Sequence, residues 1–322
     1  MKSKIKVALV GNPNSGKSSL FNALTGLRQK VGNYPGVTVD KKTGISRLSA
    51  DSLAEIIDLP GTYSLYPKSR DEEIVYEILL NPSHPDHPQV VLIVADASNL
   101  KRNLLFCSQI LDLKIPVILA LNMMDVAQEE GIYIDVDKLS EELDIPVIPI
   151  NARKNIGISE IKKQLLNPPA ASERPFIESA PATASLVENM RQHFGGNDYA
   201  LIHYSIGKQR LGHLSAEECT KIDKAIEVSG FQVAQYQGEE TLQRYARINE
   251  IMKRAVTYPQ ERVKNLTARI DKVLTHKVWG YVFFLIILAL VFQSVFAFAD
   301  YPMQWVELGT AALSEWLQTR LP

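Results

Sequence analysis

Two glycines, a lysine and a serine near the N-terminus have the spacing of a phosphate-binding loop. The stretch Gly11-Asn-Pro-Asn-Ser-Gly-Lys-Ser18 follows a short β-branched run, 5–10, and precedes a segment with helical apolar spacing. In this context G-x-x-x-x-G-K-[ST] directs backbone N–H groups and the positive end of a helix at a β-phosphate. Lys17 would lie between β- and γ-phosphates, and the Ser18 hydroxyl would bind Mg²⁺. The sequence therefore predicts binding of a nucleoside triphosphate.

Two later segments carry residues that suit the γ-phosphate and the metal. Thr38 lies in the turn-rich stretch from Gly26 to Asp40, which we expect to be a long loop that becomes ordered when ligand binds. Its hydroxyl is a candidate second ligand of Mg²⁺. Asp58 ends a predicted strand and could hold Mg²⁺ through water, while the N–H of Gly61 could contact the γ-phosphate. A simple turn is the alternative for each segment.

The base would be selected by Asn122-Met-Met-Asp125, which ends another apolar strand. A carboxylate at Asp125 can accept hydrogen bonds from guanine N1–H and N2–H₂, whereas adenine offers neither donor. Asn122 would connect this loop to the phosphate loop, and the Met123 thioether could lie along the base plane. The alternative is that both polar residues only cap the following segment. Asn151-Ala-Arg153 follows the last strand, where its backbone N–H groups could contact guanine O6.

Apolar runs alternate with helix-like segments from residue 5 to residue 166, which predicts a doubly wound α/β domain with a mostly parallel sheet. Ligands of such domains bind at the carboxyl ends of the strands, where nearly all the residues above lie. The predicted strands are 5–10, 43–49, 53–59, 90–96, 116–122 and 146–150. The predicted helices are 17–25, 71–80, 100–113, 135–143 and 158–166.

Composition sets few further limits on function. The 322 residues favour more than one domain, and a net charge of −1 gives no sign of a nucleic-acid partner. Cys107 and Cys219 are far apart, as expected of thiols in a reducing compartment, and we expect no N-terminal signal peptide. His84 and His87 stand among prolines, and a solvated loop is favoured there over a metal site.

A change of composition follows the α/β domain, which we place at residues 1–167. Residues 168–184 are rich in Pro, Ala and Ser and are predicted to be a linker. Residues 185–276 are predicted to form a small all-α domain, in which Ser215-Ala-Glu-Glu218 is typical of a helix start. Its predicted helices are 185–194, 198–206, 215–228, 239–257 and 259–275.

The segment 277–300 is long and apolar enough to cross a membrane as one helix. Basic residues precede its uncharged run, 278–299, and acidic residues follow that run, which predicts that the N-terminal domains are cytoplasmic: Arg262, Lys264, Arg269, Lys272 and Lys277 before, Asp300 and Glu307 after. Residues 301–322 are expected to form an extracytoplasmic segment that is weakly amphipathic from Trp305 to Leu317, after Pro302, and lies along the outer surface. One span cannot enclose an ion path, so we expect a truncated chain or a subunit of a homo-oligomer.

These elements together resemble a TRAFAC-class GTPase. The sequence motifs GNPNSGKS, GNYPGVTVD, DLPGTYSLYP and LNMMDVA resemble those of the cytosolic G domain of the FeoB family of bacterial ferrous-iron transporters. The resemblance covers residues 1–166. The resemblance implies a slow GTPase, a helical domain that slows nucleotide release, and passage of Fe²⁺ through further membrane segments. The expected GTP-binding residues are Gly11, Asn12, Pro13, Asn14, Ser15, Gly16, Lys17, Ser18, Ser19, Gly36, Val37, Thr38, Asp58, Gly61, Asn122, Met123, Asp125, Asn151, Ala152 and Arg153.

The resemblance also implies a potassium ion. Thr62 stands where Ras-like proteins carry the glutamine that orients the attacking water, so slow hydrolysis is expected. Asn14 matches an asparagine that ligates K⁺ in similar GTPases, and carbonyl groups from Gly32 to Tyr34 would complete the shell. The alternative for Asn14 is a residue of a left-handed turn. The groups expected to act in catalysis are Lys17, Thr38, Gly61 and Asn14.

The resulting hypothesis is a slow, K⁺-stimulated GTPase domain that drives or gates ferrous-iron uptake across the bacterial inner membrane, with Mg²⁺ as cofactor. An alternative is a membrane-anchored GTPase that acts on the ribosome or RNA, although no basic or aromatic patch outside the G domain supports it. An ATP-using kinase is disfavoured by Asp125.

Overall fold

The computed structural model describes residues 3–26, 29–34, 39–178, 181–258 and 274–320. The chain divides into two compact units, residues 1–259 and 260–322, and each is considered by itself. Of the sequence-based predictions, the residues Gly36, Val37 and Thr38 lie outside the described residues. So does nearly all of the helix expected at 259–275, together with its basic residues.

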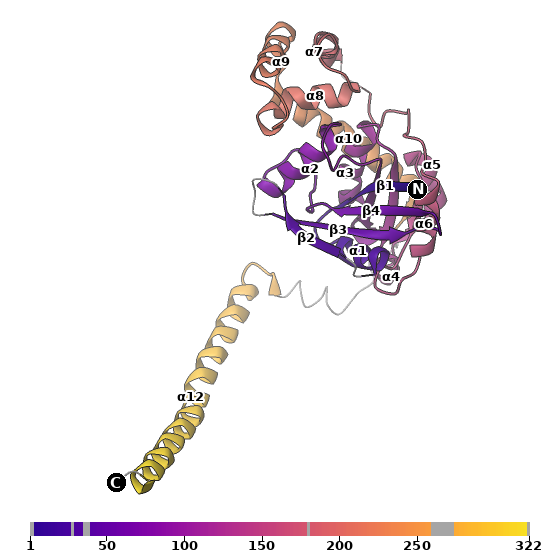
Figure 1. Ribbon diagram of the computed structural model, residues 1–322. Helices are drawn as coiled ribbons and strands as arrows, with labels where there is room; N and C mark the ends of the chain where they lie inside the picture. Colours follow the sequence, from indigo (N-terminus) through magenta and orange to yellow (C-terminus); the bar gives the residue numbers. More distant parts are fainter. Residues whose placement is uncertain (1–2, 27–28, 35–38, 179–180, 259–273, 321–322) are drawn as a thin grey trace. The chain divides into compact units, whose positions relative to one another are not determined.

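A seven-stranded sheet forms the centre of the first unit, with the strand order β2-β3-β4-β1-β5-β6-β8. The pairs β1–β4, β1–β5, β5–β6 and β6–β8 are parallel, whereas β2–β3 and β3–β4 are antiparallel and form one side of the sheet (Figure 1). The prediction of a mostly parallel α/β sheet is therefore confirmed. The strands are β1 (Ser3–Gly11), β2 (Gln29–Asn33), β3 (Asp40–Arg47), β4 (Ser52–Asp58), β5 (Val90–Asp96), β6 (Val117–Asn122) and β8 (Val147–Pro149).

Both faces of the sheet are covered by helices. Successive residues of β1 point to opposite faces, so Val7 and Leu9 join one apolar cluster while Ala8 and Val10 join the other. This is why the central strands are apolar at every position, without the alternation of a half-exposed sheet. The helices are α1 (Lys17–Thr25) and α6 (Ile158–Leu166) on the first side, and α2 (Arg70–Leu80), α3 (Leu100–Asp112) and α5 (Val136–Leu143) on the second.

The long loop expected between Gly26 and Asp40 contains a strand, so that prediction was partly wrong. β2 pairs with β3, with Lys30 opposite Thr43. Its sequence, Gln29–Asn33, has a single β-branched residue, Val31, and the strand depends on hydrogen bonds to its neighbour more than on side-chain preference. Other short elements were also not expected from the sequence: α4 (Met124–Glu129), β7 (Tyr133–Ile134), β9 (Val256–Thr257), η1 (Ala97–Asn99) and η2 (Lys208–Arg210).

Four helices follow the sheet: α7 (Pro181–Arg191), α8 (Asp198–Gly207), α9 (Ala216–Ser229) and α10 (Val233–Ala255). The capping box predicted at Ser215 and Glu218 is present, with each side chain bonded to the backbone of the other. However, α7 begins at Pro181, inside the expected linker, because proline suits the first turn of a helix. The start of α10 also precedes the expected residue 239, since Gly238 interrupts the apolar pattern without interrupting the helix.

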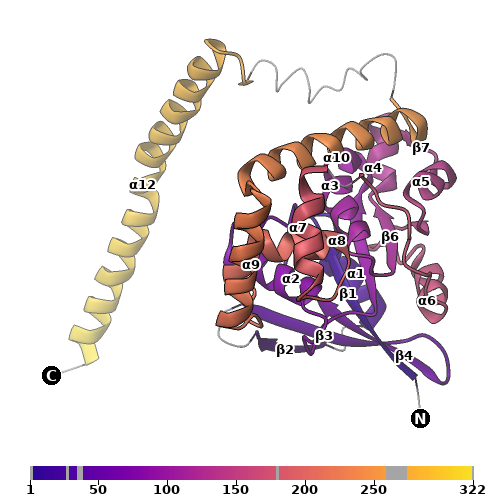
Figure 2. The ribbon, with the colours of Figure 1, turned by 90° about the horizontal axis from the view of Figure 1, so that it is seen from above.

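The helices that follow the sheet share a buried apolar cluster with the α/β part. Leu186, Leu201 and Ile248 belong to the same buried cluster as Val91 and Phe106 of the α/β part. Figure 2 shows α10 running along the unit from α9 to β7, and its last residues lead into β9, which pairs with β7. Residues 1–259 thus form one compact unit, and the division into a G domain, a linker and a helical domain remains a prediction.

The described part of the second unit, residues 274–320, contains the long helix α12 (Trp279–Arg320). The stretch Trp279–Phe296 is long and apolar enough to span a membrane, with a mean hydropathy of 2.2, judged by length and composition only. The sequence predicts a break at Pro302, but the helix continues through it. A proline removes one backbone hydrogen bond at a cost of about 3 kcal/mol, and the helical residues on both sides keep theirs.

Candidate nucleotide-binding site

The loop between β1 and α1 has a backbone that only glycine permits at two positions. A Cβ atom on Gly11 would lie 2.4 Å from the carbonyl oxygen of Val94, so a side chain has no room there. Gly16 has a φ of 92°, and a Cβ atom on it would lie 2.1 Å from Nδ2 of Asn122. Asn14 adopts a φ of 66°, the left-handed turn conformation that the sequence left as an alternative. The loop therefore curves tightly in front of the N-terminus of α1.

Three hydrogen bonds hold this loop, two to its surroundings and one within it. The Asn122 amide at the end of β6 donates to the Ser15 carbonyl at 2.9 Å, which is the connection expected between the two loops. The Ser15 N–H donates to the Asn12 carbonyl at 3.2 Å. The Thr62 N–H donates to the Gly11 carbonyl, also at 3.2 Å. The phosphate loop is thereby joined to the segment after Gly61 and to the loop that holds Asp125.

Lys17, the first residue of α1, forms an ion pair with Asp58 at the end of β4. The side chains are 13% and 7% exposed, so a cation and a carboxylate face each other in a largely desolvated place. Both line a cavity of about 470 Å³ that Ser18 and Gly61 also line. A hydroxyl, a carboxylate and an ammonium group thus converge at one end of the site.

The carboxylate of Asp125 is held by several donors at the other end. Its oxygens accept hydrogen bonds from the Val126 N–H at 3.1 Å and from the Asn151 side-chain amide at 2.8 Å, and the Lys154 ammonium lies 3.6 Å away. Partial desolvation raises the pKa of Asp125, but the backbone hydrogen bonds and Lys154 outweigh it, so the pKa lies below its usual value. The Ala152 N–H donates to the Asn122 side chain at 3.3 Å. Asp125 is therefore an oriented, ionised acceptor.

One cavity of about 620 Å³ connects these two ends. It is lined by most of the residues predicted to bind nucleotide, and by Val126, which was not predicted: Asn12, Pro13, Asn14, Gly16, Lys17, Ser18, Ser19, Gly61, Asn122, Met123, Asp125, Asn151 and Arg153. Gly11, Ser15 and Ala152 support the walls through their backbones. Residues far apart in the sequence therefore form one elongated site. Groups suited to bind phosphate lie at one end, and a carboxylate suited to accept hydrogen bonds from a base lies at the other.

The two residues predicted to complete the K⁺ shell with Asn14 do not line this cavity. Gly32 is part of β2, opposite Lys41, and Tyr34 is buried with its N–H bonded to the Val39 carbonyl. Neither lines the cavity that contains Asn14. Lys154, which forms an ion pair with Asp125, was not predicted from the sequence because no motif includes it. Its position just after Asn151-Ala-Arg153 could have indicated that it lies near the base.

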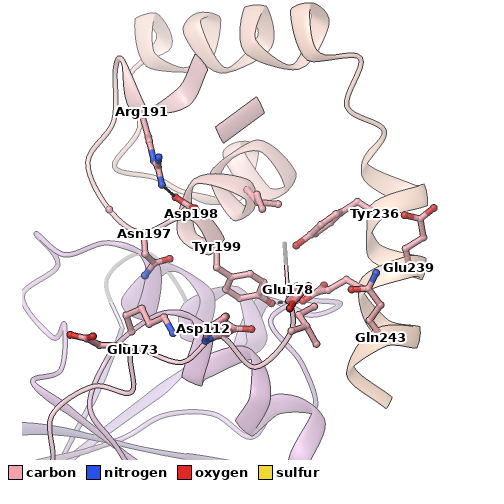
Figure 3. Close-up of a pocket in the computed structure, with 16 residues that line it drawn as sticks. Asp112, Glu173, Glu178, Arg191, Asn197, Asp198, Tyr199, Tyr236, Glu239 and Gln243 are labelled. Atoms are coloured by element: carbon pink, nitrogen blue, oxygen red, sulfur yellow. Dashed lines mark hydrogen bonds and ion pairs between the residues drawn. The ribbon is translucent and has the colours of Figure 1, made fainter. Parts of the chain in front are cut away.

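A second cavity, of about 510 Å³, contains none of the predicted site residues. It lies between the end of α3, residues 173–178, α8 and α10, and Figure 3 shows Tyr199 of α8 and Tyr236 of α10 on its walls. Its lining is mixed, with several acidic residues, two tyrosines and the basic residues Lys114 and Arg191, and it includes no phosphate loop like the one before α1.

The fold and this site define a P-loop GTPase domain, because a phosphate loop after β1, an Asp-x-x-Gly segment after β4 and an Asn-x-x-Asp loop after β6 occur in one parallel sheet. A family model described as Ferrous iron transport protein B matches residues 5–165. The chain belongs to this family, FeoB.

Curated relatives and solved structures agree with this assignment. The chain is 35% identical to a Fe(2+) transporter FeoB of Leptospira biflexa over 98% of its own length and 47% of the relative, and 34% identical to one of Staphylococcus aureus over 92% and 45%. It therefore spans about half the length of the curated relatives that it matches.

Two solved structures resemble the first unit. The cytosolic domain of L. pneumophila FeoB is 36% identical, with a TM-score of 0.65, over 78% of this chain and 99% of that one. A GDP-bound mutant of the S. thermophilus FeoB G-domain is 32% identical, with a TM-score of 0.61, over 79% and 100%. The likeness thus extends beyond the α/β part into the helices that share its core.

Proposed function

We propose that this chain binds GTP and GDP, hydrolyses GTP slowly, and forms the cytosolic regulatory part of a ferrous-iron transporter in the bacterial inner membrane. The observation that carries the proposal is the fixed Asp125 carboxylate at the far end of the cavity from Lys17. Guanine offers two adjacent N–H donors to such an acceptor, and adenine offers none. The order of the motifs also supports membership of the TRAFAC class.

The residues at the phosphate end suit Mg²⁺. A hydroxyl from Ser18 and a carboxylate from Asp58 line the same cavity and are hard oxygen ligands, which Mg²⁺ prefers. The bound ion would neutralise phosphate charge during hydrolysis. Lys17 would move its ammonium from Asp58 toward the β- and γ-phosphates, and the Gly61 N–H would donate to the γ-phosphate. Thr38 is proposed as a further ligand on sequence grounds alone.

The environment of Thr62 supports a slow reaction. This residue follows Gly61, where an attacking water would need to be oriented. Its side chain is 1% exposed, and its hydroxyl lies 2.9 Å from the Ser64 carbonyl and 3.2 Å from a carboxylate oxygen of Glu72. A hydroxyl that is occupied inside the protein cannot orient water, so the chain needs another source of transition-state stabilisation.

Asn14 is the proposed site of that stabilisation, through a bound K⁺ ion. It lines the cavity beside Lys17 and stands in the loop that wraps the phosphates. Because Gly32 and Tyr34 lie outside this cavity, the proposed ligands of K⁺ are Asn14 and the phosphate oxygens alone. A monovalent cation there would offset charge that develops during hydrolysis, in place of an arginine.

We expect steady-state hydrolysis of GTP, and none of ATP, to be faster in K⁺ than in Na⁺ by about tenfold or more, the scale of one added electrostatic stabiliser. The Asn14→Ala variant should retain GDP binding and lose the difference between the two cations. Rates are measured at matched ionic strength with the whole chain in detergent. Turnover of ATP would contradict the proposed nucleotide, whereas equal rates in both cations would contradict only the K⁺ site.

Asn151 provides a further prediction, because its amide donates to Asp125 at 2.8 Å. We expect Asn151→Ala to weaken GDP binding about fivefold, the effect of losing roughly 1 kcal/mol of orientation and hydrogen bonding. Calorimetric titration with GDP measures this change. Lys154→Ala is the matched control, since an exposed ion pair at 3.6 Å contributes little, and a larger loss in that variant would show that charge rather than orientation matters.

The transport role is proposed from the relatives, which are Fe(2+) transporters. The apolar stretch Trp279–Phe296 supports attachment to the membrane, and the basic residues before it support a cytoplasmic position for the GTPase part. The ferrous ion is substrate here, and its path would lie in membrane segments other than this helix.

A further inference from the structure

A third cavity, of about 560 Å³, lies away from the nucleotide site, and every residue that lines it is charged. Its lining residues come from α5, from the segment after α6 and from α10, and four are basic and two acidic: Lys138, Glu141, Glu142, Arg174, Arg247 and Arg254. None of them lines the cavities of the nucleotide site. The proposed GTPase reaction therefore gives no role to this group, which we call the basic cavity.

Helical spacing brings two walls of the basic cavity together. The apolar side of α5 faces the core, so Lys138 and Glu141, three positions apart, lie on its exposed side. On α10, Arg247 and Arg254 are seven positions apart, about two turns, and therefore lie on one side of the helix. Figure 2 shows the C-terminal part of α10 beside α5, and the two helices are in contact.

Two of the arginines already have an acidic partner across this contact. The Glu142 carboxylate, 15% exposed, lies 3.1 Å from Nη2 of Arg247 and 2.7 Å from Nη1 of Arg254. These ion pairs connect α5 to α10, so a structural role accounts for these three residues. Glu250 also pairs with Arg247, at 3.2 Å, but its side chain is largely exposed and it does not line the cavity.

Arg174 is not explained by that structural role. Its backbone is held in place, because its carbonyl accepts a hydrogen bond from the Lys114 ammonium at 3.0 Å and the Phe176 N–H donates to Asp112 at 2.7 Å. Within the part of the chain that the structure describes, the Arg174 guanidinium forms no ion pair. A third guanidinium thus lines the same cavity without a carboxylate to neutralise it, and an anion among these like charges would relieve their repulsion.

The chemistry of the lining selects the kind of anion. Guanidinium groups match phosphate oxygens with pairs of parallel hydrogen bonds, and a phosphate monoester carries close to two negative charges. The volume of the basic cavity is within the range of small-molecule sites. Glu141 opposes an anion, since its carboxylate lines the same cavity and forms no ion pair within the described residues. A doubly charged group is therefore favoured over a singly charged one.

We propose that the basic cavity binds a phosphate group, supplied either by a small soluble phosphate compound or by the headgroup of an anionic phospholipid. Arg174, Arg247 and Arg254 would donate to its oxygens, and Arg174 would provide the charge that no carboxylate of the protein offsets. This site is separate from the phosphate loop, and its occupancy does not depend on the proposed binding of GTP.

The test is protection of Lys138 from an amine-reactive ester, in the whole chain in neutral detergent with saturating GDP, followed by mass spectrometry. Pyrophosphate is the soluble probe, and phosphatidic acid in the micelle is the lipid probe, with phosphatidylcholine for comparison. Pyrophosphate can also contact the phosphate loop, but a readout at Lys138 reports on the basic cavity. We expect half-maximal protection at about 1 mM or less of at least one probe, as a few charge-assisted contacts provide.

Two variants of the basic cavity should shift this protection in opposite directions. Arg174→Gln should weaken binding of the effective probe about tenfold, through loss of one charge-assisted contact. Glu141→Gln should strengthen it about threefold, because a carboxylate no longer repels the anion. Arg70→Gln is the matched control, since this arginine of α2 is 83% exposed and lines none of the three cavities, and it should behave as the wild type does. Opposite shifts cannot result from damage to the fold.

Lys163 of α6, whose side chain is 73% exposed, serves as the reference lysine and should react equally with and without probe. Protection of Lys138 by pyrophosphate alone would support a soluble ligand, and protection by phosphatidic acid alone would support a headgroup. Absence of protection by both probes, or equal protection in the wild type and Arg174→Gln, would overturn the site. A separate titration with GDP tests the proposed nucleotide binding, so the two proposals can fail independently.

Discussion

Replacing Lys17 by alanine should lower the affinity for GTP and GDP by about 100-fold and reduce GTP hydrolysis below detection, since one charge-assisted contact to phosphate is worth about 3 kcal/mol. The loss has two parts. The cation that would contact the phosphates disappears, and Asp58, whose side chain is 7% exposed, loses its ion-pair partner. An unpaired carboxylate would then face the incoming phosphates at the entrance to the site. Calorimetric titration measures the nucleotide affinity, and steady-state phosphate release measures GTP hydrolysis.

The control for this variant is Lys101→Ala, which removes an exposed lysine of α3 that lines neither cavity of the nucleotide site. It should bind GDP as the wild type does. In cells that depend on this protein for ferrous iron, Lys17→Ala should also abolish uptake. Uptake that survives in a variant shown to bind no nucleotide would mean that GTP is dispensable for transport, and the proposed regulatory role would fail.

The phosphate end of the site could be predicted from the sequence because its determinants are local. The spacing of Gly11 and Gly16, a preceding strand and a following helix are enough to specify the loop. The same holds for Asp58 and Asp125, each at the end of an apolar run, because parallel strands bring their carboxyl ends to one edge. Gly16 and Asp125 line one cavity of the site, Asp58 lines the cavity beside it, and Gly11 supports the loop between them.

The contacts between distant segments could not be predicted in this way. Asn151 was expected to act through its backbone, but its side chain holds Asp125, and no pattern in one segment specifies the partner in another. The bond between Tyr66 and Glu240 has the same character. An amphipathic pattern shows that one face of α10 is buried without showing that it joins the same apolar cluster as the α/β part.

Edge elements were missed for a different reason. β2 contains polar residues and a glycine, and its pairing with β3 supplies hydrogen bonds that side-chain preferences do not report. The continuous helix α12 shows the opposite case, since Pro302 carries a strong local preference against helix that the rest of the helix overrides. Prediction from local sequence therefore succeeded where the residues of one segment determine its conformation. It failed where pairing with another strand, as in β2, or the rest of a long helix, as in α12, determines the conformation.

Replacing Asp125 by asparagine should change which base is bound. Guanine presents two donors, N1–H and N2–H₂, and the carboxylate can accept both, whereas an amide has one acceptor and one donor. We expect the GTP affinity to fall by about 100-fold or more, because a donor of the base would face a donor of the protein. Xanthosine triphosphate has a carbonyl in place of the 2-amino group, so the Asp125→Asn variant should bind it more tightly than the wild type does.

The comparison of GTP with xanthosine triphosphate separates base recognition from damage to the fold. A variant that merely unfolds would lose both nucleotides, but an inverted preference requires an intact site with a changed hydrogen-bond pattern. Asn151→Ala in the same assay should weaken both nucleotides together, because Asn151 orients the group at 125 without reading the base. If Asp125→Asn retained a preference for GTP, then the base would be selected by other contacts, and the assignment of this end of the cavity to guanine would be wrong.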